Sequence, residues 1–290
     1  MTAGIIRIGI AGWTYAPWRG VFYAKEITRE QELAYAASRL RTIEINDTFY
    51  GLQRPEIFAS WAEQVPADFV FAVRAPRIIT HVLRLRDVRV PLANFMASGL
   101  LRLGIHLGPI LWRFPLNFRF DPERVGAFLK MLPHDTGHAA GLGRGHDKAL
   151  RGRAWLDVDT RRPMRHAVEV RHESFRCPAF IDLLREHDIG LVCADSADSP
   201  RLMDITSDFV YCRLQGSTES QAQGYDNVAL DEWRRRINIW AGGEEPADAE
   251  RVGGKARPRR RDVFVVFDSE KKIRAPANAM ELVRRLRSPG

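Results

Sequence analysis

The sequence is poor in cysteine and has no long apolar run. Its three cysteines, Cys177, Cys193 and Cys212, are odd in number and form no C-x-x-C pair, so neither a disulfide framework nor a thiolate zinc site is expected. No apolar run approaches the roughly 20 residues that a membrane-spanning helix needs. The N-terminal segment before Ile5 lacks the basic region of a signal peptide. These absences predict a cytoplasmic protein with no membrane partner.

Two common ligand-binding motifs are absent as well. The run from Gly9 to Trp13 is not the glycine-rich phosphate fingerprint of dinucleotide-binding folds. His81 and His172 belong to no H-x-x-x-H or similar spacing, so no metal site is expected. The sequence assigns no cofactor.

The positive charge is unevenly distributed along the chain. Lys and Arg number 44 against 36 Asp and Glu, for a net charge of +8. Much of the excess lies in two Gly-rich or Pro-rich segments, Gly141 to Arg165 and Arg251 to Arg261. A solvated loop is the simpler interpretation of the densest run, Arg257 to Arg261, because no aromatic residues interleave there to stack on bases. Nucleic-acid binding through Arg144 to Arg153 and Arg257 to Arg261 is the alternative.

Strand-like and helix-like segments alternate along the chain. Strands are expected at residues 5–12, 42–46, 69–74, 110–114, 167–172, 190–195, 209–214 and 263–268. Helices are expected at residues 29–40, 55–65, within 91–103, and at 121–132, 147–154, 177–187, 230–241 and 278–286. Alternation repeated about eight times over ~250 residues predicts a single TIM-type (β/α)8 barrel.

The predicted barrel is somewhat irregular, because the crossover between the sixth and seventh strands contains little helix. We expect one domain over residues 1–290, with polar insertions at about 134–165 and 242–261. A chain of this length can bury a sizeable core without a metal or a disulfide. The main alternative, a doubly wound open sheet, is disfavoured by the missing phosphate fingerprint.

The fifth predicted strand carries charge on one face only. Val168 and Val170 face one way, and Ala167, Glu169 and Arg171 face the other. The second strand has the same pattern, with Glu44 and Asn46 on its polar face. Since helices should cover the apolar face, these charged groups must point into an enclosed space, where a charge is tolerated only if it is paired or used.

Inward-pointing side chains at the carboxyl ends of barrel strands line the functional mouth. The strand ends place there Trp13, Glu44, Asn46, Arg74, Trp112, Glu169, Arg171, Asp195, Arg213 and Asp268. The loops just beyond add Tyr15, Thr48, Tyr50, Arg77, His81 and His172. Guanidinium groups match phosphate and carboxylate bidentately. The four arginines Arg74, Arg77, Arg171 and Arg213 therefore predict an anionic small-molecule ligand.

Several of these motifs resemble the YecE-like family, also called domain of unknown function 72. The similar motifs are Gly12-Trp13-Thr14-Tyr15, Glu44-Ile45-Asn46-Asp47-Thr48-Phe49-Tyr50, Ala75-Pro76-Arg77, Leu107-Gly108-Pro109-Ile110-Leu111-Trp112, Glu169-Val170-Arg171-His172 and Asp208-Phe209-Val210-Tyr211. The resemblance spans nearly the whole chain and implies a barrel of this type, but the family has no established activity to transfer.

The chain departs from the family pattern at four positions. The family usually has Lys at Arg74, Gln at Arg113, His at Gln215 and Asn at Ser269. Three of these positions adjoin the expected mouth. Chemistry that relies on a titratable Lys or His there is therefore not implied for this chain.

Two classes of function follow. The first is a hydrolase or lyase acting on a phosphorylated or acidic sugar-like compound, in which arginines clamp the anion, aromatic rings stack on the sugar, and Glu169 with Asp195 or Glu44 performs acid–base catalysis. The second is a non-catalytic binding protein for an anionic ligand or nucleic acid. A metal-dependent barrel enzyme is a weaker third option, because adjacent arginines repel a divalent cation.

Each candidate residue also has a purely structural interpretation. Glu169 and Arg171 can form a buried ion pair, and Glu44 and Asp195 can do the same for Arg74 and Arg213. The aromatic residues can be packing residues, which is the commoner role of aromatic side chains.

Overall fold

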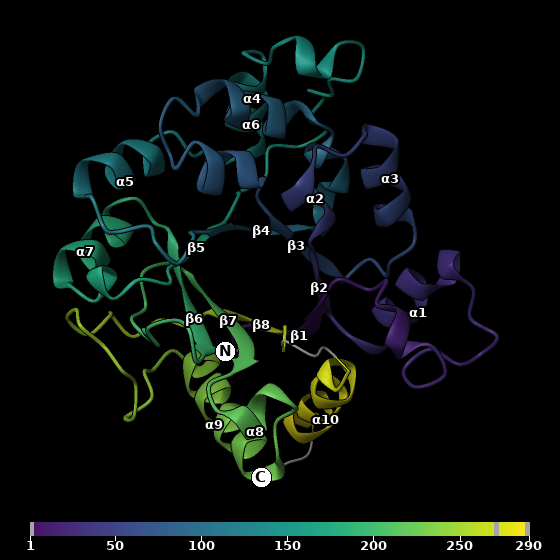
Figure 1. Cartoon of the computed structure of the whole chain (residues 1–290), viewed down its shortest axis with the longest axis vertical. Coiled ribbons are helices and arrows are strands. Elements are labelled where there is room, and N and C mark those ends of the chain that lie inside the picture. The colour runs from purple at the N-terminus through teal and green to yellow at the C-terminus, as the bar shows by residue number, and fades with distance from the viewer. Residues whose placement is uncertain (1–2, 270–272, 288–290) are drawn as a thin grey trace.

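Eight parallel strands close into a barrel in the computed structural model, which describes residues 3–269 and 273–287 (Figure 1). The strands are β1 (Ile6–Ala11), β2 (Thr42–Ile45), β3 (Val70–Arg74), β4 (Leu107–Arg113), β5 (His166–Glu169), β6 (Gly190–Ser196), β7 (Phe209–Gly216) and β8 (Asp262–Phe267). Each strand pairs with the next one along the chain, and β8 pairs with β1 to complete the ring. The predicted (β/α)8 barrel is confirmed, and every predicted strand overlaps an observed one.

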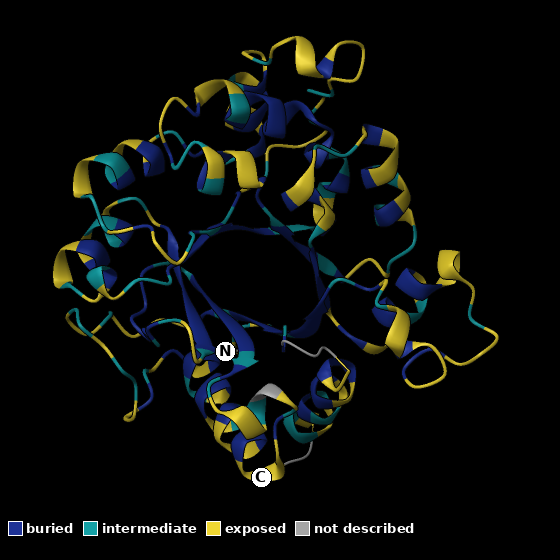
Figure 2. Ribbon diagram, viewed as in Figure 1, coloured by how far each residue is buried: buried dark blue, intermediate teal, exposed yellow. Residues whose placement is uncertain are grey.

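Helices surround the barrel and present apolar faces to it (Figures 1 and 2). They are α1 (Glu32–Arg39), α2 (Asp47–Tyr50), α3 (Pro55–Glu63), α4 (Arg89–Ala97), α5 (Pro122–Leu129), α6 (Thr136–Gly143), α7 (Pro178–Glu186), α8 (Glu219–Ala222), α9 (Asn227–Gly242) and α10 (Ala275–Arg287). Local signals set several helix starts. Asp121 caps α5 by accepting a hydrogen bond from the backbone N–H of Arg124 at 3.1 Å, and Pro122 occupies the first helical position.

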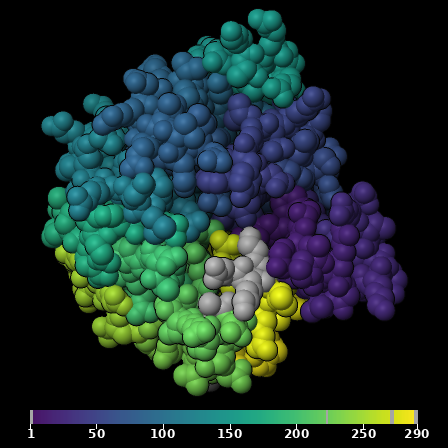
Figure 3. Space-filling view, viewed as in Figure 1, coloured from purple at the N-terminus to yellow at the C-terminus, as the bar shows by residue number. Residues whose placement is uncertain are grey.

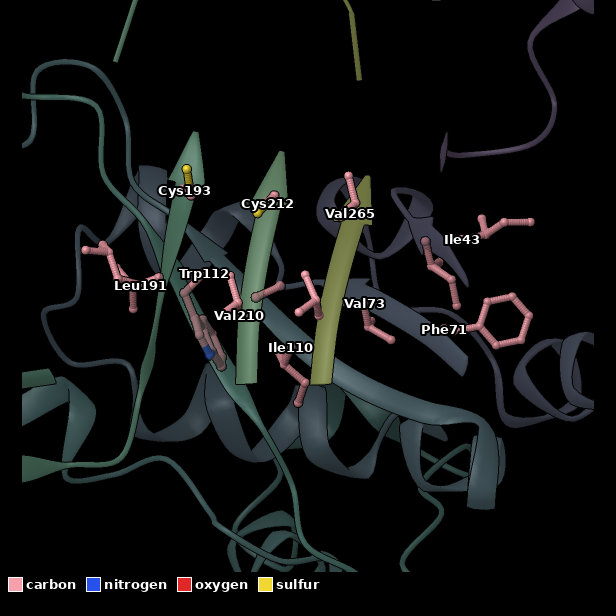
Figure 4. Close-up of a cluster of buried hydrophobic side chains, with 14 of the residues drawn as sticks. Ile43, Phe71, Val73, Ile110, Trp112, Leu191, Cys193, Val210, Cys212 and Val265 are labelled. Atoms are coloured by element: carbon pink, nitrogen blue, oxygen red, sulfur yellow. The ribbon is translucent and has the colours of Figure 1, made fainter. Parts of the chain in front are cut away.

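Side chains alternate between two apolar layers along each strand. The inner layer fills the barrel with alanine, branched aliphatic and aromatic residues, including Ala72, Leu111 and Tyr211. The outer layer packs against the helices, and Figure 4 shows part of it, with Val73, Trp112 and other side chains directed away from the barrel axis. This alternation leaves only the last inward position of each strand for polar groups at the mouth.

The crossover between β6 and β7 is irregular, as predicted. Residues 197–208, all of them described, join β6 to β7 without a helix, whereas α8 and α9 both follow β7. The polar stretch 134–165 contains α6, which packs on α4, and a short 3-10 turn at Lys148–Leu150. The sequence predicted a helix at 147–154 and missed α6, whose three glycines lower its helix propensity.

Two structural features bear on partners and metals. In the part of the chain that the structure describes, no helix is long and apolar enough to cross a membrane. The same residues contain no group of three or more His, Cys, Asp or Glu side chains arranged to hold a metal ion.

Candidate functional site

A cavity of about 870 Å³ opens at the carboxyl ends of the strands. Seven of the eight strands contribute to it, because the residue at or just beyond the end of each of β2 to β8 lines its wall. The lining residues are Asn46, Tyr50, Arg74, Arg113, Arg171, Ser196, Ala197, Asp198, Gln215, Gly216, Thr218, Glu219, Asp268 and Ser269. In Figure 3, segments from the first and last thirds of the chain lie side by side on one face of the molecule.

Arg213 lies beneath the cavity and joins three carboxylates. Its guanidinium is fully buried and donates to both carboxylate oxygens of Glu44, at 3.0 and 2.9 Å. It also donates to Glu169 at 2.6 Å and to Asp268 at 2.5 Å. Buried charges need this degree of pairing to offset the cost of leaving water. Arg213 therefore fixes the ends of β2, β5, β7 and β8 relative to one another.

Glu169 is held as an ionised carboxylate, and Glu44 shares its buried partner Arg213. Glu169 also accepts from Arg113 at 2.9 Å. Burial alone would raise the pKa of Glu169, but Arg213, Arg113 and Arg74 outweigh it and lower the pKa to about 2. Glu44 accepts a further hydrogen bond from the Tyr211 hydroxyl at 2.8 Å, and burial together with Glu44 raises the pKa of that hydroxyl. The low pKa of Glu169 makes this residue a fixed negative charge near pH 7, and not a proton carrier.

Arg74 lines the cavity and has no carboxylate partner among the residues that the structure describes. It stacks on the ring of Phe49 at 3.7 Å from the ring centroid, and the Thr48 hydroxyl fixes its backbone by donating to the Arg74 carbonyl at 2.6 Å. Its Nε is buried without a hydrogen-bond partner, and no ion pair to it occurs among the described residues. Burial, followed by the charge of Arg213, lowers the pKa of Arg74. This desolvated cation has unused N–H donors.

Arg171 adds further unused donors. Its Nε is also buried without a partner, and its only carboxylate contact among the described residues is a 3.4 Å interaction with Asp198. The Asp198 side chain is 69% exposed, so water weakens that attraction. Three arginines and three carboxylates, Asp198, Glu219 and Asp268, line the cavity. Because Asp198 and Glu219 are exposed to water, the unscreened charge on the buried side of the cavity is mainly that of the arginines, which favours an anion.

His81 lies in a π-helical turn, Ile78–Val82, beside this charge. Its ring meets Phe49 edge-on at 5.1 Å, and its Nδ1 lies 2.8 Å from the Thr80 hydroxyl. Burial lowers the pKa of His81 to about 4, and the nearby arginines, led by Arg74, contribute in the same direction.

We expect His81 to be neutral at pH 7 in the free protein and to gain proton affinity when an anion binds. An anion in the cavity offsets the field of Arg74 and its neighbours, so the pKa of His81 should rise by about one unit or more. A pH titration of the His81 ring resonances by NMR, with and without inorganic phosphate, measures this shift. A pKa near 6.5 in the free protein, or no change with phosphate, would contradict the placement of the charge.

Three aromatic residues expected at the mouth lie elsewhere. Trp112 is fully buried in the outer layer, where its Nε1 donates to His166 Nδ1 at 3.1 Å (Figure 4). Trp13 packs edge-on against Trp61, because the chain turns at Gly12 with a φ of +76° and directs Trp13 outward. Tyr15 packs against Trp18 at 5.5 Å. None of the three lines the cavity, since their rings pack in or against the outer layer of the barrel.

Two polar residues expected in the site also face away from the cavity. Asp195 is 1% exposed and accepts from the Tyr225 hydroxyl at 2.6 Å, on the outer face of β6. Tyr225 in turn accepts from the backbone N–H of Gly216, so Asp195 supports the rim from behind. His172 Nδ1 accepts from the backbone N–H of Ser174 at 3.1 Å and caps a short turn. Neither residue lines the cavity.

Replacing Asp195 by asparagine should leave anion affinity unchanged and lower the free energy of unfolding by about 1 kcal/mol. The amide oxygen can still accept from Tyr225, while the 3.5 Å ion pair to Arg201 is lost. Phosphate titration by calorimetry and urea denaturation of the same variant measure the two effects. A large loss of affinity with unchanged stability would restore Asp195 to the site.

The structure brings most of the other predicted residues together. Asn46, Tyr50, Arg74, Arg171 and Asp268 line the cavity, and Glu44, Glu169 and Arg213 lie directly beneath it. Arg77 lies in an adjoining hollow. This convergence is the arrangement that the strand-end pattern predicts.

Several residues that line the cavity were not among the predicted ligand contacts. Arg113 is the most important of them, because Glu169 pairs with Arg113 and not, as the sequence had suggested, with Arg171. The charged residue at the end of the apolar strand β4 was the available signal for Arg113. The prediction placed Trp112, the residue before it, at the mouth. Ser196, Asp198, Gly216, Thr218 and Glu219 were not predicted, and Gln215 and Ser269 were named only as departures from the family pattern. They come mainly from loops, for which strand periodicity gives no signal.

Comparison with known proteins places the chain in a family. The family described as "protein of unknown function DUF72" matches residues 7–290. The chain belongs to the DUF72 family. Among curated proteins, YecE of Escherichia coli strain K12 is 29% identical over 134 residues, which is 44% of this chain and 45% of YecE. The matched region thus spans less than half of the length of that relative.

Solved structures of DUF72 proteins share the fold. One from Thermotoga maritima has a TM-score of 0.72 at 21% identity and covers 98% of this chain and all of its own. Another from Enterococcus faecalis has a TM-score of 0.66 at 16% identity and covers both chains fully. All four positions at which this DUF72 chain departs from the family pattern, Arg74, Arg113, Gln215 and Ser269, line the cavity.

Proposed function

We propose that the cavity binds a phosphorylated or acidic sugar-like compound and that the protein is a hydrolase or lyase acting on it. The observation that carries the proposal is Arg74, a desolvated guanidinium at the cavity with no carboxylate partner among the described residues. Arg113 and Arg171 line the same space. Guanidinium groups with unused N–H donors in a partly desolvated cavity are suited to phosphate or carboxylate oxygens.

The roles of the charged residues follow from their partners. Arg74, Arg113 and Arg171 would hold the anionic group and stabilise negative charge that develops on a leaving group. Glu44 and Glu169 keep Arg213 and Arg113 in place. Asp195 is not assigned a role in acid–base catalysis, because its carboxylate faces away from the cavity. Asn46, whose buried Oδ1 has no hydrogen-bond partner, could accept from a sugar hydroxyl.

A second candidate is a binding protein without catalysis. The low pKa of Glu169 favours it, since an enzyme of this kind needs a carboxyl group that can exchange a proton near neutral pH. The same arginines would then hold an anion that is not turned over.

One experiment separates these candidates. The purified protein is incubated with a panel of sugar phosphates and uronic acid derivatives, and release of inorganic phosphate and formation of a new double bond are followed. Wild type is compared with Arg74→Met and with the control Arg41→Met, an exposed arginine just before β2 at the opposite end of the barrel. Turnover that only Arg74→Met abolishes supports the enzyme. Binding without turnover supports the binding protein, and the absence of any binding contradicts both.

The basic loops give weaker support to a nucleic-acid partner. Arg261 is 5% exposed, and its guanidinium donates to the backbone carbonyls of Arg257 and Arg259. It holds the shape of its own loop and is not available to phosphates. A polynucleotide that binds with steep salt dependence, lost on neutralising residues 144–153, would favour this partner instead.

A further inference from the structure

A second hollow of about 270 Å³ adjoins the charged cavity, and its wall is mostly apolar. Phe49, Leu52, Pro76, Ile78 and Pro91 form much of that wall. Ile78 is 41% exposed there, although it is a large apolar side chain. The hollow therefore offers apolar surface that nothing else in the described chain covers.

The two spaces meet at α2. Tyr50, at the end of this helix, lines both the cavity and the hollow. Phe49 lines the hollow and carries the guanidinium of Arg74 on its ring face at 3.7 Å. The guanidinium of Arg74 at the cavity is thus in direct contact with Phe49, which forms part of the apolar wall of the hollow.

The polar group at the edge of the hollow is already satisfied. The Asn94 side chain donates to Asp147 Oδ1 at 3.0 Å, and its own oxygen accepts from the Asp147 backbone N–H at 3.0 Å. Asn94 consequently has little hydrogen-bonding capacity left for a ligand. Arg77 contributes the hollow's positive charge. An uncharged polar group such as a second sugar gains little from this surface, whereas an apolar group gains from burial.

We propose that the ligand is amphipathic, with an anionic group bound by Arg74, Arg113 and Arg171 and an aromatic or apolar group seated in the hollow beside α2. An aryl or alkyl ester of a phosphate is the simplest member of this class. A cavity of about 150 Å³ is enough for a benzene ring in a protein interior, so the hollow can take one ring. This inference rests on the proposed anion-binding function and adds an aromatic or apolar group to the anionic compound proposed there.

Calorimetric titration with inorganic phosphate and with phenyl phosphate tests the inference. Phenyl phosphate should bind wild type about tenfold more tightly, because its ring is buried in the hollow. Ile78→Asp should abolish this preference while leaving phosphate affinity within about twofold. Val82→Asp is the matched control, since Val82 lies in the same turn, is 56% exposed and does not line the hollow. It should retain the preference.

The outcomes distinguish this inference from the proposed function. Equal affinity of wild type for the two probes, or loss of the preference in both aspartate variants alike, overturns the amphipathic ligand and leaves the anion site intact. Failure of both probes to bind wild type overturns the anion site and the inference with it. Phenyl phosphate binding that depends on Ile78 but not on Val82 supports the proposal.

Discussion

Replacing Arg213 by methionine should lower the free energy of unfolding by about 3–5 kcal/mol at pH 7. The substitution leaves Glu44, Glu169 and Asp268 near one another without the guanidinium that joins them. Urea denaturation followed by circular dichroism measures the loss. Tyr211→Phe is the control, because it removes a single hydrogen bond to Glu44 and should cost only about 1–2 kcal/mol.

The pH dependence gives a second readout of the same cluster. The pKa of Glu169 in the folded protein is lowered to about 2, below its ordinary value of 4.5. The ionised carboxylate therefore adds its full contribution to the free energy of unfolding above pH ~4.5, and this contribution is lost as the pH falls towards 2. Without Arg213 that pKa should rise, because the largest stabilising charge is gone. The difference in the free energy of unfolding between wild type and Arg213→Met should therefore shrink as the pH falls from 7 to 4. A deficit below about 1 kcal/mol, or one independent of pH, would show that Arg213 is not the centre of the cluster.

Replacing Arg74 by methionine should abolish most anion binding while leaving stability unchanged or raised by about 1 kcal/mol. Charge-assisted hydrogen bonds contribute about 1.5–3 kcal/mol each, so phosphate affinity should fall roughly 10- to 100-fold. Stability should not fall, because the wild-type guanidinium is desolvated, unpaired in the described chain and close to Arg213. Calorimetry and thermal denaturation measure the two effects.

Arg113→Met is the matched control for Arg74→Met. Both arginines line the cavity, but Arg113 pairs with Glu169 at 2.9 Å. Its loss should therefore reduce stability as well as affinity. If Arg74→Met were as destabilising as Arg113→Met, Arg74 would be a structural residue and the anion site would lose its main support.

Strand periodicity predicted the fold and the central carboxylates. Glu44 and Glu169 alternate with β-branched residues on β2 and β5, so only one orientation buries the apolar face. The prediction failed on β4, where Leu111 and Trp112 are both apolar and either could face inward. Large apolar residues on both faces remove the signal that alternation provides.

The partners of the charged groups could not be predicted. Glu169 pairs with Arg213 and Arg113, which come from β7 and β4, rather than with the nearby Arg171. Alternation could have excluded Asp195, because it shares a face with Leu191 and Cys193, which pack outward. Its contact with Tyr225 depends on a loop that follows β7. Periodicity fixes the face of a side chain but not its long-range neighbour.

A crystal structure of the protein grown with phenyl phosphate tests the central claim most directly. We expect phosphate oxygens about 3 Å from guanidinium nitrogens of Arg74 and of Arg113 or Arg171. Phosphate bound only at exposed arginines of residues 144–153 or 257–260, with the cavity free of ligand, would contradict it.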